Sequence, residues 1–190
     1  MESKNIMIVG VGGQGTLLAS KLLGRILLEN GYDVKVSEVH GMSQRGGSVV
    51  TYVRCGDKVY SPIIDKGEAD IIVSFELLEA ARWAEYLKEG GILLTNTQKI
   101  NPMPVITGAA DYPKALEQKL AALPIRLDAM DALGLALQAG SAKAVNLVLL
   151  GRLSRYFHFT DEQWQDAIEK SVPAKFLELN KKAFALGAEA

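Results

Sequence analysis

A glycine-rich turn between an apolar run and a helical pattern is the sequence feature that most restricts the possible folds. Asn5 to Val9 (NIMIV) is short and almost wholly apolar, which indicates a strand covered on both faces. Gly10 to Gly15 (GVGGQG) follows it and matches the G-x-G-x-x-G pattern. Between Gln14 and Asn30, charged residues recur at a four-residue spacing among leucines, as on the exposed stripe of a helix. The order of strand, turn and helix predicts an α/β fold.

Further strands and helices are predicted along the rest of the chain. The expected strands are Asp33 to Glu38, Ala69 to Val73, Gly91 to Thr95 and Ile125 to Leu127; the expected helices are Leu77 to Lys88, Tyr112 to Ala122, a largely helical region from Asp128 onward, and a buried apolar stretch from Ala144 to Leu153. Asn101 to Pro104 (NPMP) is a break. Thr160 to Gln163 has the arrangement of a capping box, and Pro173 is expected to open the last helix. Trp164 and Phe176 are expected to pack in the core.

An antiparallel element interrupts this alternation. Ser48 to Arg54 and Lys58 to Tyr60 are rich in β-forming residues and are separated by Cys55-Gly56-Asp57, which predicts a hairpin. We therefore predict one α/β domain over residues 1–190. It should be a three-layer α/β/α, Rossmann-like domain with a mixed, mostly parallel sheet, an antiparallel hairpin and a helical C-terminal region.

Composition excludes several classes of function. The formal net charge is −1 and the charges are spread along the chain, so we expect no nucleic-acid partner. The start has no secretory signal pattern and no apolar run is long enough to span a bilayer, so a cytoplasmic protein without a membrane partner is expected. A single cysteine, Cys55, cannot form an internal disulfide or hold an iron–sulfur cluster alone. His40 and His158 are too far apart in sequence to indicate a metal site.

The glycine turn can hold an anion. Glycines let the backbone turn tightly and approach a ligand, and the unpaired N–H groups at the start of a helix attract negative charge. The candidate binding residues are Gly12, Gly13, Gln14, Gly15 and Thr16. Glu38 stands near the position of a ribose-binding carboxylate, so a stand-alone NAD(P)-binding oxidoreductase is an alternative. However, no helical pattern follows the second strand, and a tight turn without a ligand is a further alternative.

A polar loop follows the second predicted strand. Its candidate binding residues are His40, Gly41, Ser43, Gln44, Arg45, Gly46 and Gly47. Arg45 suits a phosphate or carboxylate, or it forms an ion pair with Glu38 or Glu76. His40 is a proton carrier, a hydrogen-bond donor or a loop anchor. Glu76 and Asn96 follow later strands, so we expect four polar loops to meet at one sheet edge, where ligands of open α/β sheets bind. No catalytic residue is assigned in this chain.

Several motifs together resemble a known family. These are GVGGQG at Gly10 to Gly15, EVHGMSQRGGSV at Glu38 to Val49, Asn96-Thr97 ahead of Pro102, and PAKF at Pro173 to Phe176 followed by Asn180 and Ala183-Phe184. They are similar to the gamma domain of 2-oxoacid:ferredoxin oxidoreductases, in particular to the beta subunit of the indolepyruvate enzyme. The resemblance covers nearly the whole chain, and HGMSQRGG is its most specific part.

The resemblance implies oxidative decarboxylation of an aryl 2-oxoacid with coenzyme A (CoA), which gives an acyl-CoA and passes electrons to ferredoxin. It places thiamine diphosphate, Mg and the iron–sulfur clusters in a larger alpha subunit, so this chain alone holds no cofactor and is inactive without its partner. Its glycine turn and polar loop would help to bind the co-substrate CoA or close the active site of the partner. A third alternative is a non-enzymatic assembly subunit whose loop only docks onto another protein.

Overall fold

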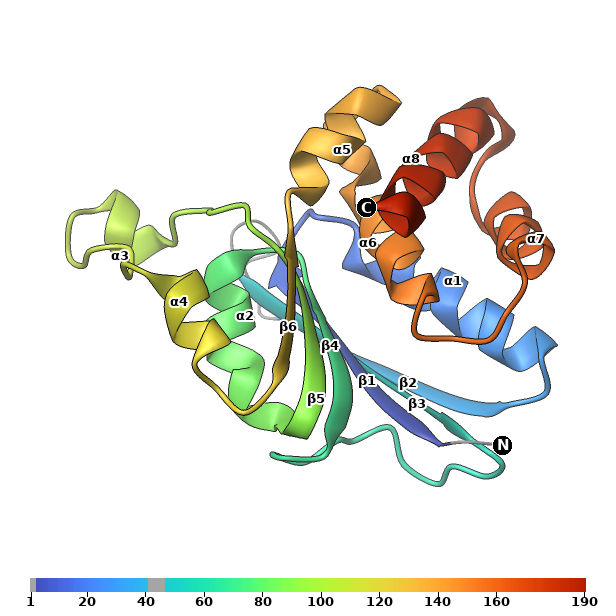
Figure 1. Ribbon diagram of the computed structural model, residues 1–190, viewed down its shortest axis with the longest axis horizontal. Coiled ribbons are helices and arrows are strands. Elements are labelled where there is room, and N and C mark those ends of the chain that lie inside the picture. Colours follow the sequence, from blue (N-terminus) through green and yellow to red (C-terminus); the bar gives the residue numbers. More distant parts are fainter. Residues whose placement is uncertain (1–2, 41–46) are drawn as a thin grey trace.

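The computed structural model describes residues 3–40 and 47–190, which form one six-stranded sheet with helices on both faces (Figure 1). The strands are β1 Lys4–Val11, β2 Asp33–His40, β3 Ser48–Gly56, β4 Ala69–Ser74, β5 Leu87–Asn96 and β6 Arg126–Met130. The helices are α1 Thr16–Glu29, α2 Leu77–Trp83, α3 Met103–Ile106, α4 Leu116–Ala121, α5 Ala132–Ala139, α6 Val145–Ser154, α7 Asp161–Ser171 and α8 Leu177–Glu189. The predicted three-layer α/β architecture is confirmed.

The sheet has the strand order β2-β3-β1-β4-β5-β6. β1, β4, β5 and β6 pair in parallel. The buried, almost continuous apolar sequences of β1 and β4 are typical of strands covered on both faces, whereas β6 is a partly exposed edge strand. β3 lies between β1 and β2 and is antiparallel to both. β1 and β2 therefore run in the same direction, and their carboxyl ends reach the same edge of the sheet.

The antiparallel hairpin lies at a different place from the predicted one. β3 continues through Cys55 to Gly56 and pairs with β2, so the polar loop connects the two hairpin strands. Residues 58–60 form no strand, because β3 already has a partner on each side. The segment is held instead by a hydrogen bond from Val59 N–H to the Asp33 carboxylate at 2.8 Å. Cys55 is buried in β3 rather than placed in the predicted turn, and buried thiols are usually inert.

Two apolar clusters fill the layers on either side of the sheet. α1, α5, α6, α7 and α8 cover one face, and α2 and α4 cover the other (Figure 1). α6 is buried along most of its length beneath α8. Gly151 and Gly187 allow this close approach, since a Cβ atom at either position would overlap a backbone carbonyl of the other helix.

Several predicted boundaries are wrong. The helix predicted to reach Lys88 ends at Trp83, because a 3-10 turn follows and β5 already begins at Leu87. α4 begins at Leu116 rather than Tyr112, and the proline-rich break contains the short helix α3. Phe176 is 47% exposed, whereas Trp164 is in the core as predicted.

The C-terminal half is stabilised by a partly buried ionic contact and a helix cap. Asp128 on β6 accepts hydrogen bonds from Arg152 Nε at 2.8 Å and from the Tyr156 hydroxyl at 2.6 Å. Burial raises the pKa of the Asp128 carboxyl, but these two bonds outweigh it and the pKa lies below its ordinary value. The same burial, with the bond to Asp128, raises the pKa of Tyr156 to about 12. The predicted capping box between Thr160 and Gln163 is present at the start of α7.

Candidate functional site

Four segments that follow strands lie at one edge of the sheet. They are the glycine turn after β1, the end of the polar loop between β2 and β3, and the segments after β4 and β5. Gly12 N–H donates to the Gly47 carbonyl at 2.9 Å, which joins the glycine turn to the end of the polar loop. The structure thus brings together the described parts of all four segments.

The glycine turn has an open conformation that only glycine adopts without strain. Gly13 has φ +96° and Gly15 has φ +88°, both in the left-handed region. Gly15 is the N-cap of α1, and no side chain in residues 3–40 or 47–190 caps this helix. The first turn of α1 also contains no acidic residue. The N–H groups at the start of α1 are therefore available to a negatively charged ligand.

Two pockets flank this turn. One, of about 460 Å³, is lined by Gly12, Gly13, Gly15, Thr16, Leu17, Glu38 and Val49. The other, of about 480 Å³, is lined by Gly13, Gln14, Gly15, Gln98, Ile100, Leu133, Ala142, Lys143 and Val145. Among the described residues, no heavy atom other than those of Gly13 and its chain neighbours lies within 4 Å of the position that a Cβ on Gly13 would occupy. Gly13 and Gly15 therefore form the rim between the pockets, and Gly13 leaves room for a ligand against the backbone.

Gln14 braces the turn from within. Its side-chain oxygen accepts a hydrogen bond from Val11 N–H at 2.8 Å, and its side-chain nitrogen donates to the Phe75 carbonyl at 3.1 Å. The amide that sequence reasoning assigned to ligand binding thus links the ends of β1 and β4.

Glu76 is 1% exposed and holds the segment that follows β5. One carboxylate oxygen accepts a hydrogen bond from Glu79 N–H at 2.8 Å and caps α2. The other accepts from Ile100 N–H at 3.0 Å and from the Tyr112 hydroxyl at 2.6 Å. Burial, together with the bond to Glu76, raises the pKa of Tyr112 well above its ordinary value. Both oxygens of Glu76 thus make bonds within the chain.

Asn96 is fully buried and connects three strands. Its side-chain nitrogen donates to the Phe75 carbonyl at 3.2 Å, after β4. Its oxygen accepts from Ala132 N–H at 3.2 Å, after β6. Asn96 therefore fixes the exits of β4, β5 and β6 relative to one another.

The remaining predicted site residues are placed as follows. Gly12, Gly13, Gly15 and Thr16 line a pocket, and Gly47 bonds to Gly12. His40 ends β2, where its backbone is paired with Val49. Gly41, Ser43, Gln44, Arg45 and Gly46 lie outside the described residues. Glu38 lines the pocket of the glycine turn.

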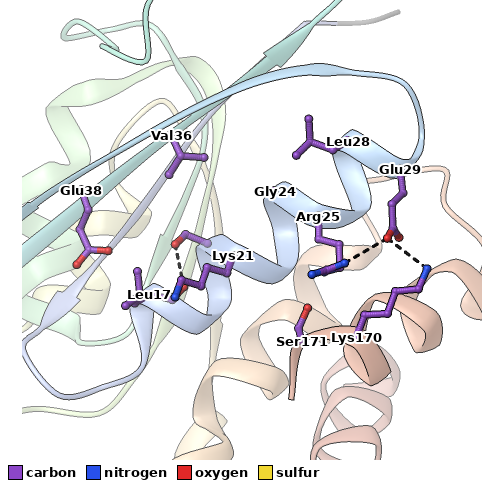
Figure 2. Close-up of a pocket in the computed structure, with 11 residues that line it drawn as sticks. Leu17, Lys21, Gly24, Arg25, Leu28, Glu29, Val36, Glu38, Lys170 and Ser171 are labelled. Atoms are coloured by element: carbon purple, nitrogen blue, oxygen red, sulfur yellow. Dashed lines mark hydrogen bonds and ion pairs between the residues drawn. The ribbon is translucent and has the colours of Figure 1, made fainter. Parts of the chain in front are cut away.

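A larger groove of about 740 Å³ runs beside α1, between β2 and α7 (Figure 2). Leu17, Gly24 and Val36 face it, and Glu29 closes one end by pairing with Arg25 at 3.4 Å and Lys170 at 3.3 Å. It shares Leu17 and Glu38 with the pocket of the glycine turn. The walls of this groove are the sides of α1, β2 and α7. It therefore lacks the arrangement of backbone N–H groups that makes the start of α1 a candidate position for an anion.

Sequence reasoning missed Glu79. This side chain is nearly buried, and its carboxylate accepts a hydrogen bond from the Ser48 hydroxyl at 2.5 Å. A glutamate in the first turn of an amphipathic helix usually faces solvent. The contact is seen only in the structure, where the start of β3 lies beside α2.

Residues 5–190 match the family model described as pyruvate ferredoxin/flavodoxin oxidoreductase. The indolepyruvate oxidoreductase subunit IorB of Thermococcus kodakarensis is 46% identical over 195 residues, which cover 100% of this chain and 96% of the relative. The IorB subunit of Archaeoglobus fulgidus is 40% identical, with 96% and 92% covered.

Solved structures show the same fold. The pyruvate oxidoreductase subunit PORC of Thermotoga maritima superposes with a TM-score of 0.76 at 25% identity and covers 100% of this chain and 97% of that chain. The 2-oxoglutarate:ferredoxin oxidoreductase of Magnetococcus marinus, solved with 2-oxoglutarate, CoA and succinyl-CoA bound, has a TM-score of 0.77 at 17% identity. It matches 100% of this chain over 31% of its own length, so the same fold occurs there as part of a longer chain.

Proposed function

Since the chain belongs to the pyruvate ferredoxin/flavodoxin oxidoreductase family, we propose that it is the small subunit of an indolepyruvate:ferredoxin oxidoreductase whose glycine turn binds CoA. The chain is a subunit of a 2-oxoacid ferredoxin oxidoreductase complex. The IorB relatives, which it matches over nearly their full length, support an aryl 2-oxoacid as substrate. We further propose that residues 1–190 form one gamma-type domain.

The observation that carries the CoA proposal is the uncapped start of α1 beside an open pocket. The diphosphate and 3′-phosphate of CoA are anions of the kind that helix N–H groups bind. Gly13 allows such a group to approach the backbone, and the pocket of about 460 Å³ gives it space. Arg45, in the loop that ends at Gly47, would add a guanidinium contact.

The redox chemistry belongs to the partner in this proposal. One cysteine cannot ligate an iron–sulfur cluster, and residues 3–40 and 47–190 contain no group of three His, Cys, Asp or Glu side chains that could hold a metal ion. As the resemblance to the 2-oxoacid:ferredoxin oxidoreductases implies, we assign thiamine diphosphate, Mg and the clusters to a larger alpha subunit. Thiamine diphosphate supplies the carbanion chemistry of decarboxylation when bound there. This chain binds and orients CoA and excludes water, and electrons reach ferredoxin through the complex.

The experiment is reconstitution with the partner subunit. Indolepyruvate oxidation is followed by reduction of a viologen dye while CoA is varied. Arg45→Ala should raise the KM for CoA with little change in assembly. An unchanged KM and rate would contradict the role of this chain in CoA binding. Loss of co-purification alone would favour the assembly-subunit alternative.

A stand-alone NAD(P)-binding oxidoreductase is the second candidate, because Glu38 lines the pocket of the glycine turn. However, β2 lies at the sheet edge and leads into antiparallel β3, so the second half of a dinucleotide fold does not follow it. Calorimetric titration of the isolated chain with NAD or NADH separates the two. Micromolar binding without a partner would favour the second candidate.

A further inference from the structure

Glu79 is a nearly buried carboxylate beside the candidate site and outside the set of predicted binding residues. It lies in the first turn of α2 and is 3% exposed. One oxygen accepts hydrogen bonds from the Ser48 hydroxyl at 2.5 Å and from Trp83 Nε1 at 3.4 Å. The other pairs with Arg82 at 3.2 Å, whose side chain is 47% exposed. Both oxygens of Glu79 therefore have partners, and one of them connects α2 to the start of β3.

Ser48 connects Glu79 to the glycine turn. Ser48 is the first residue of β3, and its backbone is paired with Val11, the last residue of β1. The preceding Gly47 carbonyl accepts the hydrogen bond from Gly12 N–H. The path from Glu79 to Ser48 and then to Gly47 and Gly12 consists of two hydrogen bonds and one peptide bond. It ends at a backbone group that lines the pocket of the glycine turn.

The first turn of α2 also holds the other segments of this edge. The Phe75 carbonyl, just before α2, accepts from the side chains of Gln14 and Asn96. Glu76 holds the segment after β5 through Ile100. The bond between Ser48 and Glu79 is the one side-chain hydrogen bond that joins the end of the polar loop to α2 among the described residues.

We propose that Glu79 is a positioning residue for ligand binding, which acts through Ser48 to fix the glycine turn and the end of the polar loop relative to each other. This inference rests on the proposed function, because the ligand it positions is CoA. Glu79 itself does not line the pocket of the glycine turn. A pre-organised pocket requires such supporting contacts, since a displacement of about 1 Å can reduce the rate about 100-fold.

The test uses the reconstituted complex and three variants of the contact. Ser48→Ala removes the hydroxyl donor and leaves Glu79 with Trp83 and Arg82. Ser48→Thr restores a hydroxyl and suits a strand position. Glu79→Gln keeps the size of the side chain and an acceptor for Ser48, but it loses the charge that pairs with Arg82. Asp128→Asn is the matched control, because it weakens a partly buried contact on β6, which is three strands away from β1 and its glycine turn.

We expect Ser48→Ala to raise the KM for CoA by on the order of tenfold, with kcat changed much less. Ser48→Thr should return the KM close to that of the unaltered complex, and Glu79→Gln should fall between. In Ser48→Ala, hydrogen exchange at the Gly12 amide should also become faster without ligand. Asp128→Asn should lower the melting temperature with no change in the KM for CoA.

Two results would overturn the inference. One is a KM for CoA in Ser48→Ala equal to that of the unaltered complex. The other is an equal rise in KM in the Asp128→Asn control, which would mean that general loss of stability is the cause. If Ser48→Ala fails to fold, the KM for CoA and the hydrogen exchange at the Gly12 amide are compared between Glu79→Gln and Ser48→Thr instead. A rise in the KM for CoA in Gly13→Ala but not in Ser48→Ala would reject the positioning role of Glu79 and leave the proposed function intact. If the unaltered complex showed no dependence on CoA, both the proposed function and the role of Glu79 would be rejected.

Discussion

Gly13→Ala tests whether the glycine turn binds the ligand. The φ of +96° at Gly13 places an alanine in the left-handed region, which costs about 1–2 kcal/mol of folding free energy. Apart from its chain neighbours, the new Cβ meets no atom of the described residues within 4 Å, so these residues add no clash to this strain. It projects instead into the open space beside the backbone, where the ligand is proposed to approach. The variant should fold with a modest loss of stability.

The chain offers a matched control at Gly67. Its φ is +78°, and a Cβ there also meets nothing within 4 Å. Gly67 lies just before β4 begins at Ala69, at the edge of the sheet opposite the glycine turn. Gly67→Ala should therefore lose a similar free energy of unfolding, about 1–2 kcal/mol, without touching the site.

The two variants should differ in CoA kinetics. A hydrogen bond from a backbone N–H to a charged group is worth about 1.5–3 kcal/mol, so displacing one phosphate contact should raise the KM for CoA about 10- to 100-fold. Urea unfolding measures the stability of each variant, and steady-state assays of the complex measure the KM. Equal KM values for CoA in Gly13→Ala and Gly67→Ala, at equal loss of stability, would mean that the glycine turn does not bind CoA.

Three further predictions concern stability. Asp128→Asn should lower the free energy of unfolding by about 1–3 kcal/mol at pH 7. The folded pKa of Asp128 lies below its ordinary value of 3.8, so the stabilisation from Arg152 is complete above that pH and is lost as the pH falls through the folded pKa. The urea unfolding curves of the two proteins should therefore converge in strong acid and not at pH 6. Tyr112→Phe removes the hydroxyl bonded to Glu76 and should cost about 1 kcal/mol, with faster hydrogen exchange in residues 97–115; exchange unchanged there would show that the bond does not hold this segment. Thr160→Ala removes the helix cap of α7 and should cost about 1 kcal/mol by thermal unfolding, whereas Thr160→Ser should cost much less.

Most of the fold could be predicted from local patterns. The buried strand β1, the glycine turn and α1 follow from apolar continuity and helical spacing, and the capping box at Thr160 from its side-chain spacing. The position of the hairpin could not be predicted from local patterns. Residues 48–56 are rich in β-forming residues, and this composition does not indicate which strands they pair with. Pairing depends on contacts far apart in the chain, and a local turn signal at Gly56 does not determine it.

The candidate site could be predicted in part. The sequence indicated that polar residues follow several strands. Their meeting at one edge of the sheet follows from the common direction of those strands. The partners of each side chain could not be predicted: Gln14, Glu76 and Asn96 all bond to neighbouring segments of the chain. Long-range hydrogen bonds of this kind have no spacing signal in the sequence, and Glu79 was missed for the same reason.

The central claim is that the backbone amides at the start of α1 bind CoA in the assembled complex. Hydrogen–deuterium exchange of the reconstituted complex, with and without saturating CoA, measures this most directly. CoA should slow exchange in the peptide from Gly12 to Leu18, whose amides at the helix start have no helical partner. Unchanged exchange in that peptide, with CoA-dependent protection only in the partner subunit, would contradict it.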